Sequence, residues 1–171
     1  MTANSRRRMI YDILAASSAP VSAGTLASQL DVSRQVIVGD VALLRASGTS
    51  VSATPRGYVL ERESAGLLRT IACAHTLDNM ENELNVIVDN GCEAVDVIVE
   101  HPVYGQMKGE LRLVSRYDVS CFAAKLHETS APPLSALTNG IHLHTIRCPD
   151  EAAFDRVCSE LEKQGILFEQ E

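Results

Sequence analysis

Hydrophobic positions in the first fifty residues repeat with helical spacing and predict three short helices. The first helix runs from about residue 6 to residue 16, and its apolar residues are Met9, Ile10, Ile13 and Leu14. The second begins after Ser22, a residue suited to cap a helix, and places Leu26 and Leu30 on its buried side. The third carries an apolar stripe and ends at Gly48.

A short turn, Asp31-Val32-Ser33, joins the second and third predicted helices. Two helices joined in this way and preceded by another helix are typical of a helix-turn-helix, whose last helix enters the DNA major groove by its N-terminal end. Residues 51–60 alternate as two short strands around a Pro55-Arg56-Gly57 turn, which predicts a wing with Arg56 at its tip.

Three residues at the start of the third helix have side chains suited to DNA, namely Ser33, Arg34 and Gln35. Ser33 can cap the helix and touch phosphate, while Arg34 and Gln35 can form paired hydrogen bonds to base edges. Periodicity alone leaves an alternative, a three-helix packing module in which these side chains only solvate a face.

The rest of the chain alternates strand-like and helix-like segments. The strands are predicted at residues 67–74, 95–99, 109–114, 141–146 and 165–168. The helices are predicted at residues 78–89, where Asp78 and Glu81 have capping-box spacing, 117–127 and 150–164. This order predicts an α+β domain built on a mixed sheet, joined to the first part by a polar segment at residues 61–64.

Charge divides the 171-residue chain at the same place. Residues 1–62 hold seven Lys and Arg against four Asp and Glu, a net charge of +3, whereas residues 63–171 hold eight against eighteen, a net charge of −10. All five histidines lie in the second part. Such asymmetry indicates two modules with different partners, a DNA-binding domain over residues 1–62 and an α+β domain over residues 63–171.

The composition and the cysteines point to a cytoplasmic protein. No apolar run approaches the roughly 20 residues that a membrane span needs, and the N-terminus lacks the apolar segment of a signal peptide. The five cysteines form no C-x-x-C pair, so neither a disulfide framework nor a zinc ribbon is expected. We expect them to be reduced, and most of them to be small core residues.

His142 and His144 carry the clearest chemical signal. Residues two apart on a strand point to the same face and lie roughly 6–7 Å apart, so both imidazoles can bind one ion. His75 at the end of another strand and Glu83 on the following helix offer two further ligands, and the set suits zinc, nickel, iron or manganese. Taken alone, this pattern also fits a polar strand face. We interpret His127 as an exposed helix residue.

Longer segments resemble known families. Residues 31–48 (DVSRQVIVGDVALLRASG) resemble the recognition segment of winged helix-turn-helix repressors related to the biotin repressor. Residues 65–171 resemble the three-histidine (3H) ligand-binding domain, with matching segments at residues 74–76 (AHT), 96–105 (DVIVEHPVYG), 137–146 (LTNGIHLHTI) and 148–151 (CPDE). The combination resembles the niacin-responsive repressors of NAD-biosynthesis and niacin-uptake genes.

This resemblance implies a homodimer on a palindromic operator, nicotinic acid as effector, and a divalent metal held by His75, Glu83, His142 and His144. It places the effector near the metal and near the turn that contains His101 and Tyr104. A bound divalent ion would supply positive charge for an anionic effector in a domain with a net charge of −10.

Two rival functions use the same residues. A repressor for which the ion itself is the signal needs the same ligands. A metal-dependent hydrolase would activate water at an open metal position, with Glu100 as the candidate base, but the sequence shows no nucleophile or second acid beside it.

Overall fold

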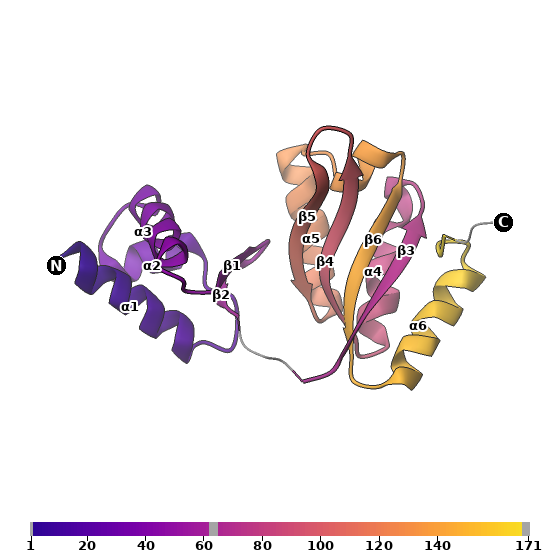
Figure 1. Cartoon of the computed structure of the whole chain (residues 1–171), viewed down its shortest axis with the longest axis horizontal. Coiled ribbons are helices and arrows are strands. Elements are labelled where there is room, and N and C mark those ends of the chain that lie inside the picture. Colours follow the sequence, from indigo (N-terminus) through magenta and orange to yellow (C-terminus); the bar gives the residue numbers. More distant parts are fainter. Residues whose placement is uncertain (1, 62–64, 169–171) are drawn as a thin grey trace. The chain divides into compact units, whose positions relative to one another are not determined.

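The computed structural model describes residues 2–61 and 65–168 (Figure 1). The chain divides into two compact units, Met1–Glu63 and Ser64–Glu171, and each is described by itself. The predicted boundary after residue 62 and most of the predicted polar segment over residues 61–64 lie outside the described residues. No helix in the described ranges is long and apolar enough to cross a membrane.

The first unit has the predicted helix-turn-helix and wing. Its elements are α1 (Ala3–Ala16), α2 (Ala23–Leu30), α3 (Arg34–Ala46), β1 (Val51–Thr54) and β2 (Gly57–Leu60). The hydroxyls of Ser22 and Ser33 cap α2 and α3 by accepting hydrogen bonds from the backbone N–H groups of Thr25 and Val36. The three helices bury Ile10, Leu26 and Ile37 completely, so the periodic apolar positions form the core of this unit.

A buried carboxylate fixes α3 against α1. Asp40, on α3, is only 4% exposed, and its Oδ2 lies 2.5 Å from Nε of Arg6 on α1. Nη1 of Arg7 lies 3.5 Å from its other oxygen. A buried carboxylate is costly unless it is paired, so this contact favours one orientation of the third helix.

The second unit is a four-stranded sheet with helices on one face (Figure 1). Its strands are β3 (Leu67–Ala74), β4 (Glu93–His101), β5 (Gly105–Leu113) and β6 (Ile141–Cys148), and its helices are α4 (Met80–Asp89), α5 (Arg116–Thr129) and α6 (Glu151–Lys163). Two 3-10 helices, η1 (Leu77–Asn79) and η2 (Leu134–Thr138), complete it. The apolar side chains of the three α-helices and of the sheet face beneath them form one core, which includes Ile87, Val119, Ile146 and Leu161.

The α+β class is confirmed, but the strand directions differ from the predicted mixture. The strand order is β3-β6-β4-β5, and all three pairings in the described sheet are antiparallel. Because β6 is antiparallel to both β3 and β4, those two strands run the same way, as a strand-helix-strand unit requires. They are not neighbours, since the last long strand inserts between them.

Three local predictions were wrong. Asp78 and Glu81 form no capping box, because η1 precedes α4 and the N-cap residue, Asn79, makes no side-chain cap. Residues 165–168 do not form a strand but only an isolated bridge between Leu167 and Cys73. The strand predicted from Gly109 begins at Gly105, because a tight turn returns β4 directly into β5.

Candidate metal centre and DNA-binding helix

The pairing of β3 with β6 brings the predicted metal ligands together. Cys73 is the register partner of His142, and Ile71 is that of His144, so both histidines project from the strand face that the helices cover. His75 follows the end of β3, and Glu83 lies in the first turn of α4. The helix α4 therefore places a carboxylate over the imidazoles of two neighbouring strands.

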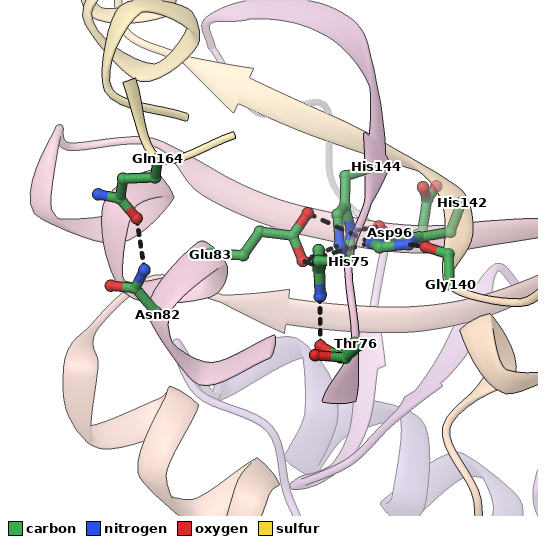
Figure 2. A network of polar contacts seen from close by, with 9 residues as sticks. All are labelled: His75, Thr76, Asn82, Glu83, Asp96, Gly140, His142, His144 and Gln164. Carbon is green, nitrogen blue, oxygen red and sulfur yellow. Dashed lines mark hydrogen bonds and ion pairs between the residues drawn. The ribbon is translucent and has the colours of Figure 1, made fainter. Parts of the chain in front are cut away.

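The carboxylate of Glu83 is the centre of this cluster, as Figure 2 shows. Its Oε2 lies 2.7 Å from Nε2 of His75 and 3.4 Å from Nε2 of His144. Both of its oxygens lie 3.2 Å from Nε2 of His142. All four side chains are at most 4% exposed. The structure thus brings all four predicted ligands together.

Each imidazole is oriented by a backbone carbonyl. Nδ1 of His75 donates to the carbonyl of Thr76 at 2.7 Å, and Nδ1 of His142 donates to that of Gly140 at 2.8 Å. Nδ1 of His144 donates to the carbonyl of Asp96 at 2.7 Å. Since these hydrogen bonds place the proton on Nδ1, neutral imidazoles present the lone pair of Nε2 to the centre, as metal ligands commonly do.

Glu83, His75 and His144 have shifted pKa values. Burial opposes ionisation of Glu83, but the charge of His144 and hydrogen bonds from all three imidazoles outweigh it and hold the Glu83 pKa well below its usual value. Burial lowers the pKa of His75 and of His144, yet the charge and hydrogen bonds of Glu83 outweigh this effect and raise both. Without a metal, the buried carboxylate thus favours the protonated forms of His75 and His144.

These residues fit a divalent transition metal. Three Nε2 atoms and a carboxylate are donors that zinc, nickel, iron and manganese accept, and the carbonyl partners supply the outer shell that such sites use. The ion would take the place of the protons, and the buried negative charge of Glu83 would hold it electrostatically.

Sequence reasoning missed a fifth donor. Sγ of Cys73, a carboxylate oxygen of Glu83 and a ring nitrogen of His142 all lie within 4.8 Å of one another. Burial, followed by the charge of Glu83 and a hydrogen bond to it, raises the pKa of the Cys73 thiol. The available signal was the spacing Cys73-x-His75 at the end of a strand, which matches His142-x-His144. Cys92 and Cys148 are core residues, as predicted.

A cavity of about 580 Å³ opens beside His75. Much of its wall is apolar and comes from η1, α4, α5 and the segment that includes η2; these side chains include Leu77, Met80, Leu126 and Pro133. His127 is exposed, as predicted, and it also lines this cavity. The cavity has the size and the lining of a small-molecule site.

The two predicted effector residues, His101 and Tyr104, lie at the β4–β5 turn and do not line this cavity. Nδ1 of His101 accepts hydrogen bonds from the backbone N–H groups of Val103 and Tyr104, at 3.1 Å and 3.3 Å. The rings of His101 and Tyr104 are 4.9 Å apart. Because β4 ends where β6 begins, this turn lies at the same end of the sheet as His75.

Glu100, the base of the rival hydrolase, lies on the other face of the sheet. Val97 pairs with His144 and shares its face, so Glu100, three residues further along the strand, points to the opposite, exposed side. The geometry thus separates Glu100 from the Glu83 cluster.

The first turn of α3 presents the predicted DNA-contacting side chains to solvent. Ser33, Arg34 and Gln35 are exposed, while Ile37 and Val41 on the other side of the helix are buried. Arg56 lies in the turn between β1 and β2 but is only half-exposed. A helix-turn-helix uses this end of its last helix to reach base edges.

Comparisons with known proteins agree with this architecture. Residues 6–59 match an HTH domain, and residues 68–170 match the 3H domain. The chain is 45% identical over 165 residues to the probable transcription repressor NiaR of Thermotoga maritima, covering 96% of this chain and 94% of the relative. It is 42% identical over 172 residues to the transcription repressor NadR of Bacillus subtilis, covering 98% and 95%.

The fold and these matches define a transcription repressor with an N-terminal DNA-binding domain and a C-terminal 3H domain. More particularly, the chain belongs to the family of repressors that includes NiaR and NadR.

Proposed function

We propose that this protein is a homodimeric repressor of NAD-biosynthesis or niacin-uptake genes, and that nicotinic acid, bound beside a metal ion in the second domain, controls its operator binding. The observation that carries the proposal is the position of the cavity at His75. Its apolar wall adjoins a cluster of three imidazoles and a carboxylate. The apolar wall of such a site can pack against a planar ring. The metal ion bound by the cluster can pair with an anionic group.

The metal would be held by His75, Glu83, His142 and His144, and it would supply the largest positive charge in the domain. The chain's own residues orient and enclose the site: carbonyls fix the imidazoles, and Leu77 and Met80 form part of the wall beside His75. His101 and Tyr104, at the same end of the sheet, remain predicted effector contacts.

Regulation would work by linkage between two sites. One winged helix reads a short half-site, and discrimination against a genome normally takes two half-sites placed a helical turn or a multiple apart. The second domain would therefore hold a dimer, and the effector would favour the dimer geometry in which both α3 helices fit. Typical coupling of about 1–3 kcal/mol corresponds to roughly 5- to 150-fold in operator affinity.

An operator-binding titration of the metal-replete protein tests the proposal. Saturating nicotinate should change operator affinity by a factor in this range, and nicotinamide, which lacks the carboxylate, should not. His75→Ala should abolish the response, because it removes both a metal ligand and part of the cavity wall. Leu68→Ala, on the exposed part of β3 away from the cavity, is the matched control.

The remaining outcomes separate the rival functions. Operator affinity that changes with metal concentration but not with nicotinate concentration would identify a metal-responsive repressor. Conversion of nicotinate to a product would identify an enzyme. A response that persists unchanged in His75→Ala would contradict the proposed site.

A further inference from the structure

The thiol of Cys73 faces the centre of the Glu83 cluster. We propose that Cys73 is a sulfur ligand of the metal, which it shares with Glu83 and the three histidines. This inference rests on the metal site proposed above and adds a donor of different chemistry to it.

Strand register places the thiol in the cluster. Cys73 stands directly opposite His142 in the antiparallel pair of β3 and β6, and opposed residues of such a pair point to the same face. Their ligand atoms and a carboxylate oxygen of Glu83 lie within 4.8 Å of one another. Two residues further along, His75 reaches the same carboxylate. The segment Cys73-x-His75 at the end of β3 and the segment His142-x-His144 on β6 thus place their donors around Glu83.

The other two fully buried cysteines show what a purely structural thiol does in this core. Sγ of Cys92 lies 3.0 Å from Sγ of Cys148, among apolar side chains. Sγ of Cys73, which is 0% exposed, lies instead within 4.8 Å of a carboxylate oxygen of Glu83 and a ring nitrogen of His142. A thiol this near a buried carboxylate and an imidazole is suited to bind a metal ion, whereas the Cys92–Cys148 pair fills the core.

Ligation would replace one bond by another. The S–H bond of Cys73 breaks, a sulfur–metal bond forms, and the proton leaves to solvent, so metal uptake releases at least this proton. A thiolate also narrows the choice of ion. It favours zinc, iron or nickel over manganese, which carboxylates and water suit better.

X-ray absorption on the zinc-loaded wild-type protein tests the proposal without any substitution. We expect one sulfur neighbour at about 2.3 Å in addition to nitrogen and oxygen neighbours at about 2.0–2.2 Å. Zinc bound with nitrogen and oxygen neighbours alone would overturn the sulfur ligand and leave the metal site intact. A protein that binds no zinc would overturn both proposals.

Cobalt supplies the second readout. Titration of the metal-free full-length protein with Co²⁺ should give a sulfur-to-cobalt charge-transfer band in the near ultraviolet. Cys73→Ser and Cys73→Ala should lose this band while keeping weaker visible bands from cobalt bound to the remaining ligands. Their affinity for Co²⁺ should fall by about 100-fold or more, since loss of even a residue that only hydrogen-bonds to a ligand lowers metal affinity roughly 10- to 100-fold.

Cys158→Ser is the matched control, because Cys158 lies on α6 at the edge of the same core and is only half-buried. It should retain both the band and the affinity. A band that survives in Cys73→Ser, or that disappears in Cys158→Ser alone, would contradict the assignment of Cys73.

Discussion

Nε2 of His75, just beyond β3, lies 2.7 Å from Oε2 of Glu83 on α4. The other two imidazoles contact the same carboxylate, so Glu83 joins the ligands of two strands to the helix that covers them. All three histidines of the proposed metal site therefore depend on Glu83 for their position.

Glu83→Gln should remove most bound metal while the fold persists. The amide keeps the shape of the side chain but lacks the charge that balances a cation. Elemental analysis of the purified protein measures this loss, and Glu81→Gln, an exposed acid two residues earlier, should leave metal content unchanged. His142→Ala with His144→Ala should also abolish binding. Undiminished metal in either variant would rule out this site.

The stability of the metal-free protein should depend on pH in a defined window. The raised pKa values of His75 and His144 contribute stability that is fully present below their usual value of 6.5 and is lost as pH rises through the raised values. The lowered Glu83 pKa contributes stability present above its usual value of 4.5 and lost on acidification. These groups therefore make the metal-free protein most stable between about pH 4.5 and 6.5.

Denaturant unfolding with a chelator at pH 6 and at pH 9 checks this sign. The metal-loaded protein should instead become more stable as pH rises above 6.5, because protons no longer compete with the metal ion for the imidazoles. In His142→Ala with His144→Ala, the difference between the two pH values should shrink. Metal-free protein that is equally stable at both pH values would contradict the proton-balanced cluster.

Local sequence patterns predicted the helices and the histidine pair on one strand, but they could not predict which distant strands pair with each other. The spacing of His142 and His144 fixed a shared face, but only the insertion of β6 beside β3 brings His75 and Cys73 to that face. Sequence periodicity does not contain strand order, which depends on how the helices pack over the sheet. The capping-box prediction at Asp78 failed because a 3-10 turn competes with the first turn of a helix.

Arg34→Ala and Gln35→Ala should each reduce discrimination between operator and random DNA by roughly 1–3 kcal/mol, because their side chains begin the exposed end of α3. Arg56→Ala should weaken both kinds of DNA equally, as a backbone contact would. Competition binding at fixed salt separates the two effects. Equal losses for Arg34→Ala would show that this residue contacts only phosphate.

Asp40→Ala should destabilise the first unit by about 1–3 kcal/mol, since Arg6 and Arg7 lose their buried partner but remain partly exposed to water. Thermal unfolding of the full chain measures this, and Asp12→Ala, whose partner Arg8 is exposed, should change stability by less than about 1 kcal/mol. Similar losses in both variants would mean that burial of Asp40 contributes nothing.

Gly140→Ala should weaken metal binding. Gly140 has a φ of 92°, and an added Cβ would lie 2.3 Å from the carbonyl oxygen of His75, so the start of β6 must move away from that ligand. Its own carbonyl also orients His142. Gly91→Ala, with a φ of 75° but open space around it, carries the backbone strain without the collision. Calorimetric metal titration should separate the two; equal affinities would contradict the role of Gly140.

The pairing of Arg6 and Arg7 with Asp40 also bears on how the protein responds to salt. Arg8 pairs with Asp12, and Nε of Arg45 donates to the carbonyl of Val51, so much of the cationic charge of the first unit has internal partners. Each phosphate that a protein neutralises releases counterions and adds about 0.9 to the logarithmic salt slope. A repressor with few phosphate-directed cations has a shallow slope, so its operator occupancy varies little with ionic strength.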